Sequence, residues 1–329
     1  MSSLLNKSDF DAAGRRISTV VHHTPLLSFR TLGGPFGTSV WLKCENFQKT
    51  GSFKVRGALN ALAALNPGER ARGVITISAG NHAQAVAWAA GRVEVRSVVV
   101  MPERASPAKV AAARAYGAEV VLHGDAAAAF AEAYRRADDE GLAFLHPFDA
   151  PEVIAGHGSA GVEIAADLSG PATIVVPVGG GGLIAGMAGA LSSKGILAGH
   201  AMRLFGVEPE GAAAMRRSLA DGRAARLDRT DTIADGLAPP MAGELTYRYV
   251  AELVEDVVLV SDAEILAAMR LLLTRARLVA EPSGAAAVAA LMYGRVPVPK
   301  GGVVVAVITG GNVDDGLIGR ALREGAPWP

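Results

Sequence analysis

The chain has 329 residues, half of them hydrophobic, and its 32 Lys and Arg residues balance 32 Asp and Glu residues. This length predicts about two domains with a sizeable core. Zero net charge excludes the basic field that attracts nucleic acid or an anionic membrane surface. The single cysteine, Cys44, excludes an internal disulfide and is typical of a reducing compartment, so we expect a cytoplasmic location.

Short β-branched runs alternate with alanine-rich helical stretches along the chain. Strands are predicted at 39–43, 73–78, 96–100, 118–123, 173–178, 203–208, 257–260 and 303–309, with helices such as 107–117 between them. A further helix opens with a predicted capping box, Ser261 to Glu264. The alternation predicts an α/β fold in which helices flank mostly parallel sheet. The stretch 146–153, with two prolines, is the best candidate for a domain boundary.

Two stretches could be mistaken for a targeting segment or a membrane span. The N-terminal residues contain no apolar core long enough for a signal peptide. The uncharged stretch 171–193 is long, but Pro177 and four consecutive glycines interrupt it. We therefore expect a buried strand, a tight loop and a helix there instead of a membrane span.

Lys54 lies where a cation is disfavoured. The spacing of apolar residues after Ser52 predicts a helix with Ser52 as its N-cap and Lys54 in its first turn. The positive end of a helix and apolar neighbours both favour the neutral amine, which can act as nucleophile and base. The alternative is an ordinary surface lysine, as expected for Lys43 and Lys49.

Two loops that follow predicted strands suit the binding of anions. Gly179, Gly180, Gly181 and Gly182 join a strand to a helix, and four glycines allow several backbone N–H groups to point at one phosphate. The second loop, Ser78, Ala79, Gly80, Asn81 and His82, leaves amides at a helix start for a carboxylate. The alternative for this second loop is a plain helix cap beside a core histidine.

A third strand ends at Thr309, whose hydroxyl could cap a heteroaromatic nitrogen, although an unremarkable turn is the alternative. The glycine loop also matches a loose dinucleotide fingerprint, with Glu208 ending the next strand, so an NAD-binding dehydrogenase is the alternative from another class. That fingerprint does not explain Lys54. A phosphate site, a neutral lysine, a carboxylate site and a nitrogen cap together describe pyridoxal phosphate holding an amino acid.

At this point the sequence resembles the fold type II pyridoxal-phosphate enzymes, and within them the serine/threonine dehydratases and serine racemases. The matching motifs are KTGSFKVRGA, SAGNHAQ, VIAGHG, VPVGGGGLIAG, TIADG and EPSGA, in this order, and the resemblance runs from residue 23 to residue 314. The resemblance implies two open, mostly parallel sheets, with a small domain (50–148) inserted in a larger cofactor-binding domain (1–49 and 149–329). It also implies a homodimer or homotetramer.

The resemblance implies a role for each motif. Lys54 would carry pyridoxal 5'-phosphate as a Schiff base and act as the catalytic base. The other cofactor-binding residues would be Phe53, Asn81, Gly179, Gly180, Gly181, Gly182, Leu183, Gly236, Glu281 and Thr309. The SAGNH loop, Ser78 to His82, would hold the substrate carboxylate. The implied reaction is dehydration and deamination of L-threonine or L-serine to 2-oxobutanoate or pyruvate plus ammonia; 3-hydroxyaspartate, another β-hydroxy amino acid and serine racemisation stay open.

The sequence departs from the family pattern at several positions. Ala79 stands where racemases have a proton-transferring serine, so we expect elimination without efficient racemisation. His157 stands where glutamine is usual. The metal site of racemase-like members is matched by Glu208 but not by Ala214, which leaves Glu208 as a tentative ligand and the need for a divalent or monovalent cation open. The resemblance leads us to expect a short form, without the C-terminal regulatory domain of the long biosynthetic threonine dehydratases.

The second carboxylate of 3-hydroxyaspartate would need a cation in the pocket, because burying it unpaired is costly. The place where racemase-like members can carry an arginine falls near Phe130 in this chain. Arg135 and Arg136 follow more than one helical turn later and are expected on a solvated helix face. We therefore expect threonine or serine to be preferred to the dicarboxylate.

Overall fold

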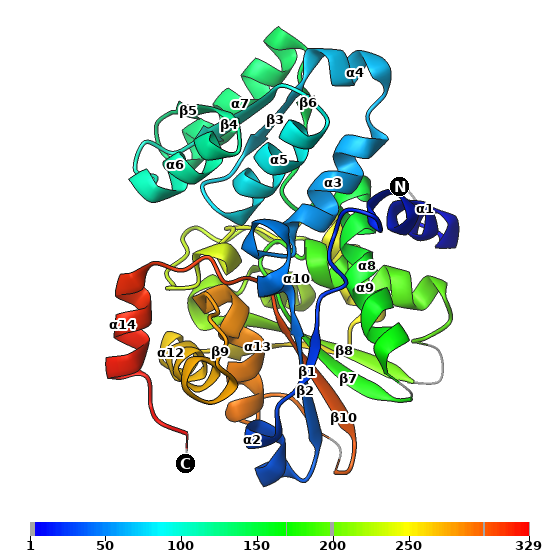
Figure 1. Cartoon of the computed structure of the whole chain (residues 1–329), viewed down its shortest axis with the longest axis vertical. Coiled ribbons are helices and arrows are strands. Elements are labelled where there is room, and N and C mark those ends of the chain that lie inside the picture. Colours follow the sequence, from blue (N-terminus) through cyan, green and yellow to red (C-terminus); the bar gives the residue numbers. More distant parts are fainter. Residues whose placement is uncertain (1–3, 169, 198–200, 299, 329) are drawn as a thin grey trace.

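The computed structural model describes residues 4–168, 170–197, 201–298 and 300–328 (Figure 1). Its strands are β1 (Leu26–Ser28), β2 (Ser39–Cys44), β3 (Val74–Ile77), β4 (Ser97–Met101), β5 (Glu119–Leu122), β6 (Ala143–Phe144), β7 (Ala172–Pro177), β8 (Met202–Pro209), β9 (Asp256–Val260) and β10 (Val303–Ile308). Within these described ranges they form a six-stranded sheet, in the order β1-β2-β10-β7-β8-β9, and a four-stranded sheet, in the order β5-β4-β3-β6. β1 runs antiparallel to β2, and the other pairs are parallel, which confirms the predicted fold class.

The helices cover both sheets on two sides. They are α1 (Lys7–Ile17), α2 (Arg30–Gly33), α3 (Lys54–Ala64), α4 (Pro67–Arg72), α5 (Asn81–Arg92), α6 (Pro107–Ala115), α7 (Ala126–Glu140), α8 (Pro151–Asp167), α9 (Gly182–Ser193), α10 (Ala214–Asp221), α11 (Glu244–Leu253), α12 (Asp262–Leu271), α13 (Pro282–Met292) and α14 (Asp315–Glu324). In Figure 1, α4 to α7 lie around the smaller sheet at the top, while α8 and α9 lie opposite α12 and α13 around the larger sheet.

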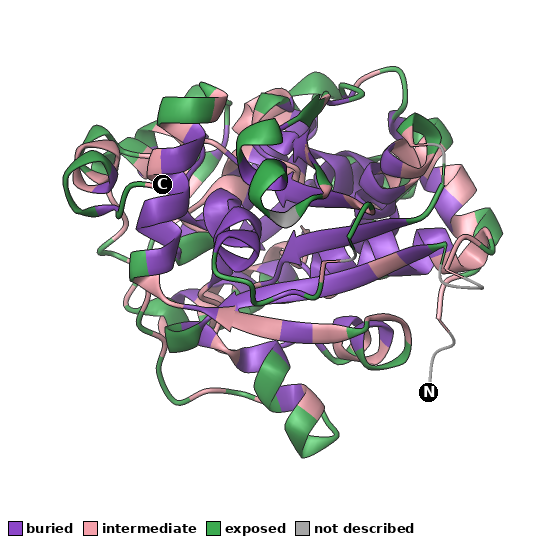
Figure 2. Cartoon of the chain, turned by 90° about the horizontal axis from the view of Figure 1, so that it is seen from below, coloured by how far each residue is buried: buried purple, intermediate pink, exposed green. Residues whose placement is uncertain are grey.

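The larger sheet is buried on both faces because its strands alternate between two cores. In β10, Val304, Ala306 and Ile308 pack in the core that contains α12 and α13. Val305 and Val307 pack in the core that contains α9 on the other face. Figure 2 shows the resulting pattern, with buried central strands and exposed outer sides of the helices. Both faces being covered explains why these strands are continuous apolar runs.

Every strand predicted from the sequence is present, within one or two residues at its ends. The predictions omit β1 and β6, which have only three and two residues and so offer no alternating pattern to detect. The stretch 171–193 folds as β7, a loop and α9, as predicted. Among the described residues, none of the helices combines the length and hydropathy that crossing a membrane requires. The capping box of Ser261 and Glu264 is confirmed.

The start of α3 differs from the prediction in one respect. Lys54 is in the first turn, as predicted, but Ser52 is not the N-cap. Ser52 is extended and forms an antiparallel bridge with Gly310, and Phe53 occupies the cap position without a side-chain hydrogen bond. Ser52 therefore pairs with the residue that follows β10 instead of capping the helix. This pairing places the start of α3 directly beside the carboxyl end of the central strand.

A buried cluster of charges, which we call the Arg56 cluster, fixes α3 from its other side. It consists of Lys43, Glu45, Arg56 and Glu163. The Arg56 guanidinium donates to both oxygens of Glu45 and both oxygens of Glu163, at 2.6 to 2.8 Å. Lys43 Nζ donates to Glu163 at 2.6 Å, so two cations face two anions. The cluster joins α3, two residues after Lys54, to β2 and α8.

Candidate active site

Lys54 and the end of β10 form the centre of the site. The Phe53 amide donates to the Thr309 carbonyl at 3.1 Å, so these two predicted cofactor residues are adjacent. Lys54 Nζ donates to the carbonyl of Pro147 at 2.8 Å and lies 5.2 Å from the centroid of the Phe53 ring. Burial lowers the pKa of Lys54 to about 8, against a smaller opposing effect of Glu281. A substantial share of the amine is therefore neutral near pH 8, as a nucleophile or base requires.

Asn81, Glu281 and Asn312 connect three separate segments of the chain. Asn81 Nδ2 donates to Glu281 Oε1 at 2.7 Å, and Asn312 Nδ2 donates to Asn81 Oδ1 at 2.8 Å. Burial, followed by repulsion from Asp235, raises the pKa of Glu281 to about 8, while the bond from Asn81 opposes this. These bonds place the SAGNH loop, after β3, against the start of α13 and the loop after β10. Asn312 is not among the predicted site residues.

The glycine loop follows β7 and opens α9. Gly181 has φ of +93°, a left-handed conformation that favours glycine, and Gly182 is the first helical residue. A methyl group on Gly180 would overlap the ring of Phe148, so glycine is required there by packing. A Cβ on Gly179 would lie 3.0 Å from the carbonyl oxygen of Gly236. The loop thus brings backbone and a free helix start together, which suits an anionic group.

Several polar side-chain atoms of the protein are buried without a hydrogen-bond partner. Those among the described residues are Asn46 Oδ1, Thr50 Oγ1, Ser52 Oγ, His82 Nδ1, both ring nitrogens of His157, Arg203 Nε and Ser283 Oγ. Ser283 lies beside Gly236, since a Cβ there would be 2.7 Å from its Oγ. Ser52 directly precedes Phe53. Because buried polar groups normally have partners, Ser52 Oγ and Ser283 Oγ fit a site built for a polar ligand.

The remaining predicted residues are distributed as follows. Leu183 is buried as the second residue of α9, and Thr309 is buried at the end of β10. Ser78 Oγ accepts from the Gly80 amide at 3.1 Å and so shapes the SAGNH loop, which includes the partly buried Ala79. His82 points away from that loop: its Nε2 lies 3.4 Å from the Leu145 carbonyl, and burial lowers its pKa to about 3. A neutral, buried His82 contributes no charge toward a carboxylate.

His157 is buried in α8 against the edge of the Phe53 ring, with ring centroids 4.8 Å apart. Burial, and then the nearby Lys54, hold the pKa of His157 well below its usual range. Gly57 allows the close approach, because a Cβ there would overlap the imidazole. His157, which stands where the family usually has glutamine, thus places a neutral imidazole ring against the Phe53 ring.

Glu208 has a structural use that sequence reasoning did not anticipate. Its two carboxylate oxygens accept hydrogen bonds from the amides of Met215 and Arg216, at 2.7 and 2.8 Å, in the first turn of α10. Among the described residues, no group of three or more His, Cys, Asp or Glu side chains could hold a metal ion. The tentative assignment of Glu208 as a metal ligand therefore gains no support from its surroundings.

Sequence reasoning missed the residues that support the centre. His146, Pro147, Phe148 and Asp149 were interpreted only as a domain boundary, yet Pro147 contacts Lys54 and Phe148 contacts the glycine loop. The combination of a histidine, a proline and an acid within four consecutive residues was the available signal. Thr246, whose Oγ1 donates to the Gly180 carbonyl at 2.7 Å, had no signal in its local sequence.

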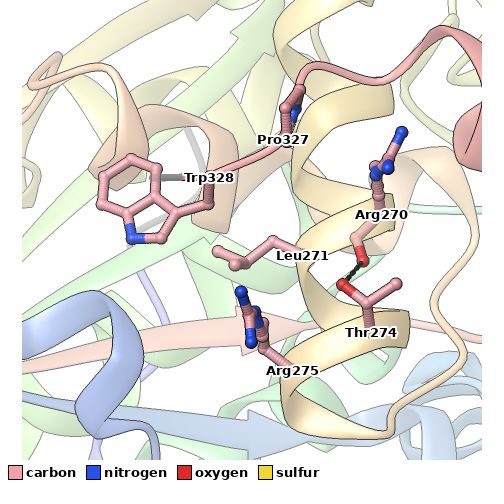
Figure 3. A pocket seen from close by; sticks show the side chains of 6 residues that line it. All are labelled: Arg270, Leu271, Thr274, Arg275, Pro327 and Trp328. Carbon is pink, nitrogen blue, oxygen red and sulfur yellow. Dashed lines mark hydrogen bonds between the residues drawn. The ribbon is translucent and has the colours of Figure 1, made fainter.

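Two surface hollows lie outside the predicted site. One, of about 220 Å³, is lined by Arg270, Leu271, Thr274, Arg275, Pro327 and Trp328 (Figure 3). Figure 3 shows Trp328 and Pro327 of the C-terminal segment facing the end of α12 and the π-helical turn after it. The other, of about 530 Å³, lies between the start of α7 and the segment 226–228. Neither is lined by any residue predicted to bind cofactor or substrate.

Comparisons with known proteins agree with this arrangement. Residues 17–310 match the family model described as "Pyridoxal-phosphate dependent enzyme". The L-threonine ammonia-lyase of Thermotoga maritima is 42% identical over 326 residues, which cover 98% of this chain and 79% of that protein. The L-threo-3-hydroxyaspartate ammonia-lyase of a Pseudomonas species is 39% identical, covering 93% and 95% of the two chains. The structure of maize serine racemase superposes with a TM-score of 0.90 at 33% identity, covering 97% of each chain. The chain therefore belongs to the family of pyridoxal-phosphate dependent enzymes.

Proposed function

We propose that this enzyme is an ammonia-lyase that removes water from L-threonine or L-serine and releases a 2-oxo acid and ammonia. The observation that carries the proposal is the Lys54 amine, whose pKa is lowered to about 8, in one site with the glycine loop and the SAGNH loop. The 42% identity to an L-threonine ammonia-lyase over nearly the whole chain supports the same reaction.

Each group of residues then has a defined task. Bound pyridoxal phosphate would supply the electron sink that makes the α-proton of an amino acid acidic enough to remove. The glycine loop and the start of α9 would hold its phosphate, and Thr309 would face its ring nitrogen. Lys54 would hold the cofactor covalently and, once its amine is free, would accept the α-proton. Asn81, which is kept in place by Glu281 and Asn312, would bind beside the ring, and the SAGNH amides would hold the substrate carboxylate.

The surroundings of Phe130 favour threonine or serine over 3-hydroxyaspartate. Phe130 packs in an aromatic group with Tyr134, Phe144 and His146, with ring centroids 5.3 to 6.3 Å away. This group contains neither lysine nor arginine. Arg135 is exposed and bonded to Glu132 and Asp139, and Arg136 is paired with Glu119 and Glu140, all on the surface of the smaller sheet. The identity to a 3-hydroxyaspartate ammonia-lyase keeps that substrate as the second candidate.

The proposal is tested with purified protein loaded with pyridoxal phosphate. Borohydride should fix the cofactor to Lys54, as peptide mass spectrometry would show, and threonine or serine should yield 2-oxo acid. Lys54→Ala should abolish both results. Lys49→Ala is the matched control, because Lys49 lies in the turn before α3 and no role is assigned to it. Turnover by Lys54→Ala, or NAD binding without a Schiff base, would contradict the proposal.

We also propose the domain organisation and assembly that the resemblance implies. All four strands of the smaller sheet fall between residues 74 and 144, which supports a small domain at 50–148 within a large domain of 1–49 and 149–329. The family resemblance is the ground on which we propose a homodimer or homotetramer. Limited proteolysis and light scattering would test these two points. The buried free thiol of Cys44 is compatible with the reducing cytoplasm, which cell fractionation would test.

A further inference from the structure

The segment His146–Pro147–Phe148–Asp149, which we call the HPFD segment, connects β6 to α8 and contacts both halves of the site. Its Pro147 carbonyl accepts the hydrogen bond from Lys54 Nζ at 2.8 Å. We infer that the HPFD segment holds the Lys54 amine in place whenever that amine is free, and that Asp149 is the positioning residue that fixes the segment. The inference rests on the proposed function, in which substrate must displace Lys54 before Lys54 can act as base.

Asp149 anchors the HPFD segment to α11. Its Oδ2 accepts from the amide of Glu244, and its Oδ1 accepts from the amides of Leu245 and Thr246, each at 3.0 Å. A carboxylate that takes three amides at a positive helix end is bound both by charge and by geometry. Moving Asp149 would leave these amides without their acceptor, so the segment is held firmly at its last residue.

The conformation of the segment is fixed from within as well. His146 Nδ1 accepts from the amides of Phe148 and Asp149, at 3.3 and 2.8 Å, which requires an unprotonated Nδ1. Burial lowers the pKa of His146 to about 4, so this acceptor persists at neutral pH. The ring of Pro147 fixes its own φ. The direction of the Pro147 carbonyl, and hence the place of the amine bonded to it, is therefore determined by the segment.

The same segment supports the glycine loop. The Phe148 ring packs on Gly180, and the Thr246 hydroxyl, at the helix end that Asp149 caps, donates to the Gly180 carbonyl at 2.7 Å. The lysine amine and the phosphate-binding loop are thus set by one structural unit. Asp149 could affect both the position of the Lys54 amine and the affinity of the glycine loop for phosphate. A test must therefore measure these two effects separately.

The experiment compares apoprotein of the wild type, Asp149→Asn and the control Asp125→Asn. The Asp149→Asn change would keep the size of the side chain. It would place an NH2 group opposite the Glu244 amide, so that two donors would face each other without an acceptor. Asp125 is the control because it also caps a helix, α7, although it accepts from one amide only, that of Ala128, at 2.9 Å. The affinity for pyridoxamine 5'-phosphate, which cannot bond covalently to Lys54, measures how well the glycine loop holds the phosphate. The first-order rate of covalent bonding at saturating pyridoxal phosphate measures how well the Lys54 amine is placed for reaction.

In Asp149→Asn the rate of covalent bonding should fall about tenfold or more, because misplacing a reacting group by about 1 Å costs at least that much. This fall should exceed any loss of affinity for pyridoxamine 5'-phosphate, and kcat should fall with the rate. The rate of covalent bonding in Asp125→Asn should stay within about twofold of the wild-type rate. Pro147→Ala, which keeps the carbonyl but frees the backbone, should show a smaller slowing in the same direction.

Two results would overturn the inference, and they are distinguishable. If both Asp149→Asn and Pro147→Ala bond the cofactor at the wild-type rate, the HPFD segment does not place the amine, whatever happens to the affinity. If Asp125→Asn slows bonding as much as Asp149→Asn, the effect is general loss of stability. A wild type that forms no covalent bond with pyridoxal phosphate would instead overturn the proposed function, and this inference with it.

Discussion

Replacing Arg56 by Ala would remove the cation that joins two buried carboxylates. In the folded protein Arg56 and Glu45 are fully buried and Glu163 is largely so. Arg56 also donates to Ser159 Oγ at 3.1 Å and to the His22 carbonyl at 3.2 Å. After the change Lys43 would be the remaining cation of the Arg56 cluster, and its Nζ bonds to Glu163 but not to Glu45, which would keep the Thr24 hydroxyl as a neutral donor.

The expected loss follows from the burial of this cluster. Breaking a buried ion pair by removing one partner costs about 3–5 kcal/mol, because the remaining charge stays buried without its partner. Folded domains are stable by only about 5–15 kcal/mol in total. Arg56→Ala should therefore lower the unfolding free energy by a large share of the whole. Arg56→Lys, which keeps the charge but loses the planar fork, should give an intermediate loss.

Urea unfolding of the apoprotein, followed by circular dichroism, measures the loss, and Arg96→Ala is the matched control. Arg96 also bridges two carboxylates, Glu119 and Glu140, but it is 45% exposed. Exposed pairs contribute about 0–1 kcal/mol, so the control should shift the midpoint little. A loss of less than about 1 kcal/mol in Arg56→Ala would refute the reasoning, since it would show that Lys43 or water compensates both carboxylates.

Three further predictions concern the site. Ala79→Ser should raise the formation of D-serine from L-serine, measured by chiral chromatography, whereas rapid racemisation by the wild type would contradict our interpretation of Ala79. Glu281 should contribute a fall in the unfolding free energy of the apoprotein as pH rises from about 4.5 to 8, because its pKa is raised to about 8 and the folded protein keeps a proton that the unfolded chain has already lost. Glu281→Gln should reduce this fall, and identical pH curves would refute it. The ratio kcat/KM should be higher for threonine or serine than for 3-hydroxyaspartate; the reverse order would mean that a cation reaches the pocket.

The strands and the glycine loop could be predicted because their signals are local. Continuous β-branched runs mark strands buried on both faces, and four adjacent glycines have few other uses than a close backbone approach. Lys54 was found through a local conflict, a cation at a positive helix end, and Phe53 through the family resemblance. In these cases the residues that determine the structure lie next to one another in the chain.

The supports of the site could not be predicted because their partners are remote. Lys54 and Pro147 are 93 residues apart, Asp149 and Thr246 are 97 apart, and Asn81 and Glu281 are 200 apart. The failure at Ser52 has the same cause, since its bridge to Gly310 displaces a cap that the local sequence favours. Such contacts depend on how the two sheets are brought together, which local patterns do not encode.

The order of strands in the larger sheet has a consequence for synthesis on the ribosome. β2 pairs with β10, so Ser39, made early, has Val303 as its register partner. The smaller sheet, in contrast, is complete once Phe144 has been made. Because chains grow from the N-terminus and distant pairings form slowly, the smaller sheet can fold while the edge of β2 that pairs with β10 still has no partner. Nascent chains of this enzyme should therefore need protection of residues 26–44 until translation is nearly finished.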